Sequence, residues 1–313
     1  MLRLVLIGLL AGFFFSSTFV LNRMMSLQGG HWVWSASLRY AYMILLLIIW
    51  LLTTRGAASA KRTLSLFFRH LPFWTAVGSI GFGAFYALIC FSADHAPGWI
   101  VATTWQFTII ATLVVLVAFG RRFPKRIWGF SAIVFIGVGM VNLSQAGTVD
   151  SLQLLYGALP VLVAAFCYPV GNQLVWEARA GNRRLPNIRA PELEHPFAKV
   201  FLMSLGSVPF WCVLVAVCNP PSPSGGQLIN TALVALFSGI AATSLFLYAR
   251  NESITGSQLA AVDATQSSEV IFALVGELLI LGGALPNLVG VAGILVAGAG
   301  LVLFVRFQET SAG

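Results

Sequence analysis

Three carboxylates lie inside a stretch of the chain that is long and apolar enough to cross a membrane, residues 257–281. They are Asp263, Glu269 and Glu277, with Gln266 between the first two. At about 100° per residue, these four side chains fall within an arc of about 120° on a helix. Contact with lipid would be very costly for such a stripe. We therefore expect it to face protein or a water-filled cavity, on a substrate or ion pathway.

Glu269 lies deepest of the three, and a carboxyl group at that depth has a specific use. Burial favours its neutral form, so it can bind and release protons. If substrate and proton exclude each other there, the site works as an antiporter. Asp263 is expected near the inner third of the span and Glu277 near its outer end. Water at the membrane surfaces would explain these two carboxylates as well as a role in transport does.

Arg39 is the cation that Glu269 would meet. It lies eight residues after His31, in the second apolar stretch, which places it roughly 12 Å from the outer surface at 1.5 Å per residue. An unpaired charge at that depth is costly, and Glu269 lies at a similar depth. We predict that Arg39 and Glu269 form an ion pair or compete for the same substrate group. An ion pair that only fixes helix packing is the alternative.

Four further residues could complete the site: Gln106, Trp105, Asn22 and Asn172. Gln106 and Gln266 occupy corresponding places in the two halves of the chain, where they would bind a polar solute or pack between helices. Trp105 lies away from both membrane interfaces, so it would stack on a substrate or fill space. Asn22 and Asn172 are expected to cap or bridge helices rather than to touch a ligand.

The composition indicates that membrane helices position these residues. The chain has 313 residues, of which 58% are hydrophobic and 9% charged, with a mean hydropathy of +0.88; a soluble domain carries about 25% charged residues. The four cysteines lie in apolar segments without metal-ligand spacing, so we expect no metal and no cofactor other than a proton. Hydropathy predicts ten spans. They are 4–25, 31–52, 71–92, 98–119, 127–145, 153–176, 197–218, 228–249, 257–281 and 284–306.

Lysine and arginine predict the orientation of these spans. With both termini in the cytoplasm, 16 of the 18 basic residues fall on the cytoplasmic side, and the exceptions are Arg23 and Arg39. Arg23, at the outer end of the first span, is expected to reach the outer headgroups. The net charge of +8 is therefore a topology signal, and we expect no nucleic-acid partner.

Ten spans divide into two halves of five, 1–147 and 148–313, which form one membrane domain. Because five is odd, the second half enters the membrane from the opposite side. Matching features recur 150 to 161 residues apart. They are Asn22 with Asn172, Gln106 with Gln266, and Gly129, Gly137 and Gly139 with Gly290, Gly298 and Gly300. We therefore predict an all-α fold of two inverted five-helix repeats, which would give one site access to each side in turn.

The chain resembles ten-helix members of the drug/metabolite transporter superfamily over nearly its whole length. The resemblance is carried by Arg39 in SASLRYAYMILL, by YALICFSADHAPGWIVAT and by SSEVIFALVGELLILGGALPNLVGVAGILVAGAG. It is most similar to the branch named putative multidrug resistance efflux transporters, which implies export through a central cavity between the repeats. Related domains often have proline near the positions of Gln106 and Gln266. Short four-helix relatives use a glutamate in their first helix for proton coupling, whereas the first span here has no carboxylate.

These observations predict a multi-pass transporter of the cell (inner) membrane, not an enzyme, that exports small amphipathic or metabolite-like solutes, with proton coupling left open. The carboxylates favour a cationic substrate, whereas Arg39 and Arg23 favour an anion or zwitterion. The expected partners are a small molecule and the lipid bilayer, with the protein a monomer or homodimer. The alternatives are a metabolite importer or exchanger, a membrane enzyme acting on lipid-linked substrates, and a structural or sensory protein. The sequence has no metal cluster or nucleophile motif to support the enzyme.

Overall fold

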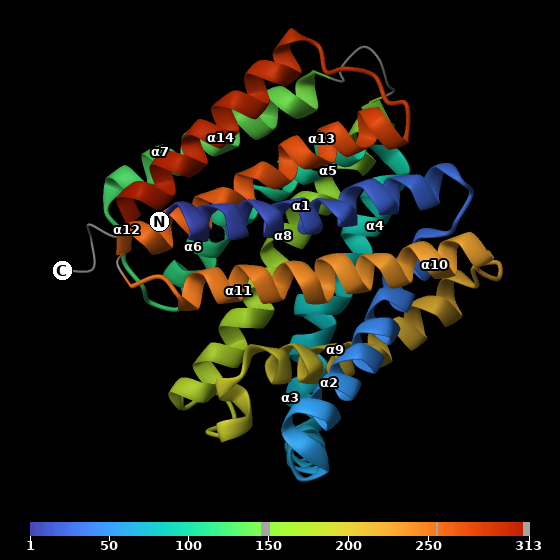
Figure 1. The fold of residues 1–313 in the computed structure, drawn as a ribbon, viewed down its shortest axis with the longest axis vertical. Coiled ribbons are helices and arrows are strands. Elements are labelled where there is room, and N and C mark those ends of the chain that lie inside the picture. The colour runs from blue at the N-terminus through green and yellow to red at the C-terminus, as the bar shows by residue number, and fades with distance from the viewer. Residues whose placement is uncertain (145–150, 255, 309–313) are drawn as a thin grey trace.

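The computed structural model describes residues 1–144, 151–254 and 256–308, and within these ranges the chain is a bundle of helices without a β-strand (Figure 1). Short π- or 3-10-helical pieces, labelled η, interrupt some of the long helices. The elements are α1 (Leu2–Leu27), α2 (Trp32–Arg69), α3 (Leu71–Gly78), η1 (Ser79–Ala84), α4 (Phe85–His95), α5 (Gly98–Trp105), α6 (Thr108–Ala118), α7 (Lys125–Leu143), α8 (Ser151–Ala180), η2 (Pro191–Glu194), α9 (Pro196–Cys218), α10 (Gly225–Val234), η3 (Ala235–Ala242), α11 (Thr243–Asn251), α12 (Gly256–Ala264), η4 (Thr265–Ser267), α13 (Ser268–Ile280) and α14 (Leu288–Gln308).

Nine helical runs in the described part of the chain are long and apolar enough to cross a membrane. They coincide with nine of the ten predicted spans, as expected for a multi-pass integral membrane protein. The tenth predicted span, 257–281, is the run formed by α12, η4 and α13. It matches the others in length, but it carries three carboxylates. The run that carries Asp263, Glu269 and Glu277 is therefore too rich in charge to be identified as a membrane span from composition alone.

The second predicted span continues further than hydropathy indicates. α2 runs to Arg69, but Gly56 has φ 79° and ψ 165°, so the run is two helices that meet at a bend. The segment 57–69, expected as a connection, is helical because alanine, lysine, arginine and leucine favour helix. Its Ala60 and Phe67 are buried against the protein. Part of the basic surface predicted for the cytoplasmic side is therefore carried on a packed helix.

Helices from the two halves of the chain pack against each other in a regular pattern. α1 contacts η3 and α13, α8 contacts η1 and α6, α2 packs along α9, and α7 runs beside α14 (Figure 1). Glycines allow the close approach of α7 and α14. A Cβ at Gly137 would collide with the backbone of Ala297, and one at Gly300 would crowd Val134. Of the glycines that recur in the two halves, Gly137, Gly290 and Gly300 lie at close contacts, whereas a Cβ at Gly129, Gly139 or Gly298 would meet nothing within 4 Å.

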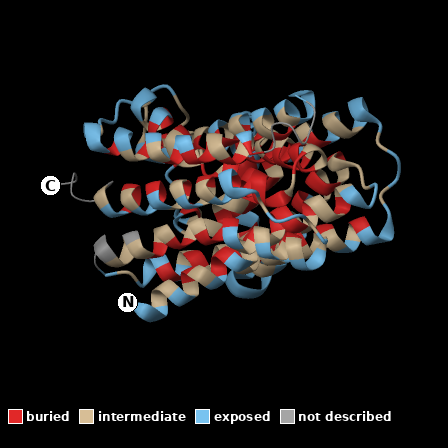
Figure 2. Ribbon diagram, turned by 90° about the horizontal axis from the view of Figure 1, so that it is seen from above, coloured by how far each residue is buried: buried red, intermediate tan, exposed pale blue. Residues whose placement is uncertain are grey.

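The apolar core is continuous at one end of the bundle and divided at the other. We call the end that holds Leu2 the terminal end, and the end that holds the 28–31 turn the far end. Through the middle and toward the far end, a single cluster takes its buried members from nine of the ten helical runs, with Met25 and Trp99 among them, and Ile294 of α14 packs against it. Buried positions fill the centre of the bundle (Figure 2).

Toward the terminal end, this cluster continues on α2, α3, α8 and α9, and two smaller clusters lie apart from it. One belongs to α6, α7 and α14, and the other to α1, α11 and α12. The buried apolar side chains of the described residues are therefore less continuous here than at the far end.

Candidate functional site

A cavity of about 260 Å³ lies inside the bundle. Its walls come from eight of the ten helical runs, and among the described residues α7 and α14 contribute none. The two charged side chains in the wall are Arg39 and Glu269. A mainly apolar chamber with a few polar groups is the usual form of a small-molecule site. The aromatic residues that line it are Phe15, Phe19, Tyr40, Phe82, Phe85, Tyr86, Trp105 and Tyr168.

Arg39 enters the cavity from α2, and neutral groups hold it. Its side chain is buried, and its Nη2 donates a hydrogen bond of 3.2 Å to the Ser238 hydroxyl on η3. The guanidinium carbon lies 4.0 Å from the centroid of the Tyr86 ring and 5.9 Å from that of Tyr40. Its Nε has no hydrogen-bond partner within the described ranges. The guanidinium is therefore stabilised by a cation–π contact and one hydrogen bond, and it faces the cavity as a cation.

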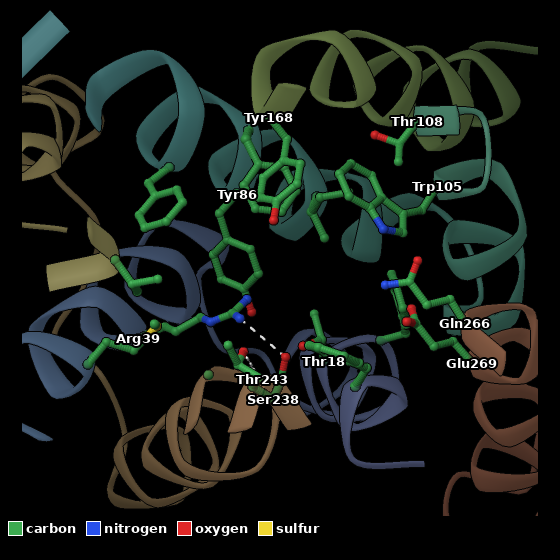
Figure 3. Close-up of a pocket in the computed structure, with 18 of the residues that line it drawn as sticks. Thr18, Arg39, Tyr86, Trp105, Thr108, Tyr168, Ser238, Thr243, Gln266 and Glu269 are labelled. Carbon is green, nitrogen blue, oxygen red and sulfur yellow. Dashed lines mark hydrogen bonds between the residues drawn. The ribbon is translucent and has the colours of Figure 1, made fainter. Parts of the chain in front are cut away.

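Glu269 lies on α13, across the cavity from Arg39 (Figure 3). It is 6% exposed, and the part of the chain that the structure describes gives it neither a salt bridge nor a hydrogen bond. The predicted ion pair between Arg39 and Glu269 is therefore wrong for this structure. Equal depth along two helices does not bring side chains on opposite walls together, and Ser238 and Tyr86 hold the arginine on its own side. Both charges face one cavity instead.

Gln106 and Gln266 both line the cavity, and each lies at a break in a helix. Gln106 lies between α5 and α6, and Gln266 lies in the 3-10 turn η4 between α12 and α13. Trp105 precedes the first break and faces the cavity (Figure 3). Its ring centroid lies 4.9 Å from that of Phe85 and 5.8 Å from that of Tyr168. The breaks therefore bring two amides and an indole to one wall.

Two π-helical pieces shape the wall that holds Arg39. η1 directly precedes Phe85 and Tyr86, and η3 contains Ser238 and Gly239. A π-turn displaces the side chains that follow it, and such turns are frequent at functional sites. One piece lies in the third helical run of each half of the chain, so the two halves are distorted at corresponding places.

Asp263 and Glu277 lie outside the cavity wall. Asp263 forms an ion pair of 3.3 Å with Arg250. Glu277 is buried and accepts a hydrogen bond of 3.2 Å from the backbone N–H of Trp99, at the start of α5, where a carboxylate satisfies a free helical N–H. The predicted common stripe is therefore divided. Asp263 lies on α12, where it pairs with Arg250 of α11, whereas Glu269 lies on α13 and lines the cavity.

Asn22 and Asn172 stand behind the cavity wall, as bridging residues were expected to do. Asn22 is buried, and its side-chain amide donates a hydrogen bond of 3.0 Å to the Tyr86 hydroxyl. The Asn172 amide donates to the Tyr168 carbonyl oxygen at 3.0 Å and accepts from the Lys199 ammonium at 3.1 Å. Both asparagines therefore support cavity tyrosines or the helices that carry them.

Arg23 has a protein partner rather than the predicted position among lipid headgroups. Its Nη1 donates hydrogen bonds to the carbonyl oxygens of Ala93 at 2.9 Å and Asp94 at 3.3 Å, at the end of α4. A cation is favoured there because the last carbonyls of a helix carry partial negative charge. Arg23 thus ties α1 to α4 near the far end.

Sequence reasoning missed seven polar residues in the described wall: Thr18, Tyr40, Tyr86, Thr108, Tyr168, Ser238 and Thr243. The Thr18 hydroxyl is buried and has no hydrogen-bond partner among the described residues. The three tyrosines could have been found by the signal that singled out Trp105, which is an aromatic residue with a polar tip inside an apolar span. Serine and threonine give no such signal because they are common in membrane helices.

Comparisons with known proteins place this geometry in context. Residues 2–310 match a protein-family model described as EmrE, putative multidrug resistance efflux transporter. The chain is 38% identical to the uncharacterized protein YjlA of Bacillus subtilis (strain 168), over 96% of this chain and 94% of that protein. It is 36% identical to an uncharacterized 42.1 kDa protein of Shouchella clausii, over 80% of this chain and 66% of that protein. A solved structure described only as "Crystal structure of protein" shares the fold, with a TM-score of 0.61 at 14% identity and coverage of 98% and 99%.

Proposed function

This chain belongs to the family of putative multidrug resistance efflux transporters, and we propose that it exports small amphipathic or metabolite-like solutes across the cell membrane by alternating access. It is a secondary-active transporter of the drug/metabolite type, working as a monomer or homodimer. The observation that carries the proposal is the cavity. Arg39 and Glu269 are both buried, they do not pair, and they face one aromatic chamber inside a membrane bundle. Charges at such depth mark substrate or ion pathways.

The packing pattern supports two inverted repeats, 1–147 and 148–313. Exchanging the repeats converts the contacts of α1 with η3 and α13 into those of α8 with η1 and α6. The same exchange maps α2–α9 and α7–α14 onto themselves. It also interchanges the breaks at Gln106 and Gln266 and the π-helical pieces η1 and η3. A two-fold axis in the membrane plane produces such a pattern, and it lets the repeats swap conformations around one central site.

The divided core supports a state that is entered from the terminal end. The far end is closed by one continuous apolar cluster, whereas two smaller clusters lie apart from it at the terminal end. With the basic residues in the cytoplasm, the terminal end is the cytoplasmic side. An exporter must take up its substrate from that side. In the second state, the apolar clusters at the terminal end would pack together and the helices at the far end would separate, which would open the cavity to the outer side.

Glu269 supports coupling of export to protons. A buried carboxyl group without a cationic partner among the described residues can carry a proton while no substrate is bound. A cationic group of the substrate would displace that proton on binding. The carrier then crosses with either a proton or a substrate at Glu269, which is the condition for antiport.

Reconstitution into proteoliposomes tests the proposal. The purified full chain is supplied with a panel of labelled amphipathic solutes, with and without a pH gradient, and protein-free vesicles provide the background. Export predicts protein-dependent flux of at least one solute that the gradient drives uphill. A metabolite importer or exchanger would move solute only with its gradient or against a counter-solute. A membrane enzyme would return the solute chemically altered, which chromatography of the vesicle contents detects.

A further inference from the structure

We propose that the substrate is a zwitterion, a small molecule with an apolar body that carries one carboxylate and one ammonium group. This inference rests on the proposed function, because it assigns the occupant of the same cavity. It starts from the placement of Arg39 and Glu269, which lie on opposite walls and which the structure leaves unpaired (Figure 3). One molecule with two opposite charges is the simplest ligand that meets both.

Arg39 is the carboxylate-binding half of the site. Its side chain is 8% exposed, its Nη2 is held by the Ser238 hydroxyl, and its Nε is buried without a partner among the described residues. A guanidinium presents its N–H groups as a planar fork that matches the two oxygens of a carboxylate. The Tyr86 ring covers one face of the guanidinium. The edge of the fork is therefore the part left for a ligand.

Glu269 is the ammonium-binding half. It is 6% exposed, and the described part of the chain supplies no donor to its carboxylate. Gln266, one helical turn before it, also lines the cavity and adds an amide oxygen as a second acceptor. An ammonium group has three hydrogen-bond donors and no acceptor, so it is the complement of this wall.

The net charge of the cavity distinguishes a zwitterion from ligands with one charge. With Glu269 ionised, Arg39 and Glu269 sum to zero. A bound cation would leave Arg39 uncompensated inside a low-dielectric chamber, and a bound anion would pair with Arg39 but would leave the Glu269 proton in place; a zwitterion keeps the sum at zero, pairs both side chains and displaces the proton. Between the two charges, Trp105 and Phe85 offer aromatic faces to an apolar body.

Binding to matched probes tests the inference. The full chain in lipid nanodiscs is titrated calorimetrically at neutral pH with phenylalanine, with phenethylamine, which lacks the carboxylate, and with 3-phenylpropionate, which lacks the ammonium. A second series uses leucine, 3-methylbutylamine and 4-methylpentanoate, so that the conclusion does not depend on one apolar body. We expect a zwitterion in at least one series to bind at least tenfold more tightly than both of its singly charged analogues.

Two substitutions locate the charges. Arg39→Gln should remove the advantage of the zwitterion over the amine, and Glu269→Gln should remove its advantage over the acid. Arg183→Gln, at an exposed position, is the matched control and should change neither ratio. If Arg39→Gln does not yield folded protein, Ser238→Ala can be used instead. It keeps the Arg39 charge but removes the hydrogen bond that positions it, and it should reduce the ratio of zwitterion to amine affinity by severalfold.

Three results would overturn the inference: a singly charged probe that binds as tightly as its zwitterion, ratios that Arg39→Gln and Glu269→Gln leave unchanged, or no binding by either series. In each case, gradient-driven flux of other solutes in proteoliposomes would leave the transporter assignment standing. The absence of any protein-dependent flux would overturn that assignment separately.

Discussion

The guanidinium of Arg39 lies against the face of Tyr86, with its carbon 4.0 Å from the ring centroid, and Asn22 holds the hydroxyl of the same tyrosine from behind at 3.0 Å. The contact joins three helical runs, because Asn22 lies on α1, Arg39 on α2 and Tyr86 on α4. It explains how a buried arginine keeps its place without a carboxylate. The position of Arg39 in the cavity therefore depends on an aromatic face, which can be tested separately from its charge.

Two substitutions of Tyr86 distinguish the contribution of its aromatic ring from that of its hydroxyl group. Tyr86→Phe keeps the aromatic face and loses the bond to Asn22, so we expect the apparent KM to rise about two- to twelvefold, since a neutral hydrogen bond contributes about 0.5–1.5 kcal/mol. Tyr86→Leu also removes the cation–π contact, for which about 2 kcal/mol when desolvated predicts a rise of at least about thirtyfold. Solute flux in proteoliposomes measures both. Equal effects of Phe and Leu would mean that the ring does not position Arg39.

Glu277 is expected to act on stability through the start of α5. Glu277→Ala removes the acceptor for the Trp99 N–H, and loss of such a cap costs about 1 kcal/mol. Glu277→Gln keeps an oxygen at the same place and should cost less. Thermal unfolding in detergent, followed by circular dichroism, should rank wild type above Gln and Gln above Ala. A higher midpoint for Ala than for Gln would contradict the capping role.

The approach of α7 and α14 depends on Gly137. A Cβ at this position would collide with the Ala297 backbone, whereas one at Gly139, on the same helix, would meet nothing within 4 Å. We expect Gly137→Ala to destabilise the fold by about 1–3 kcal/mol, as overpacking does. Gly139→Ala is the matched control and should leave the unfolding midpoint unchanged. If the two variants have the same unfolding midpoint, α7 and α14 do not approach closely at Gly137.

Thiol labelling tests the side from which the cavity is entered. In a variant without native cysteines, Thr243→Cys places a thiol in the cavity wall, and Ser35→Cys places one in the closed far end. A membrane-impermeant reagent should modify Cys at 243 from the cytoplasmic face of inside-out vesicles and should leave Cys at 35 unmodified from the outer face. The reverse pattern would place the opening at the far end.

Much of the fold could be predicted because a bilayer constrains membrane helices strongly. Hydropathy located the helical runs, nine of which are long and apolar enough to cross a membrane. Depth counting also placed Arg39 and Glu269 at one level, and both line the same cavity. These features depend on composition and on distance along a helix, which a sequence carries directly.

Rotation about the helix axis could not be predicted in the same way. The 3-10 turn η4 lies between Asp263 and Glu269, the π-helical piece η1 directly precedes Phe85 and Tyr86, and η3 contains Ser238. Such irregular turns change the angle per residue by amounts that a regular 100° projection does not contain. The predicted pairing of Arg39 with Glu269 was wrong for this reason, and because an aromatic ring took the place of the expected carboxylate.

The central claim is that Glu269 exchanges a proton for substrate. Its most direct test is substrate-driven proton flux in proteoliposomes that contain a pH-sensitive dye, using any solute that the wild-type protein transports. Wild type and Glu252→Gln, which removes an exposed carboxylate near the terminal end, should release protons when solute is added. Glu269→Gln should show no solute-driven proton movement. Proton release by Glu269→Gln at the wild-type rate would contradict the claim.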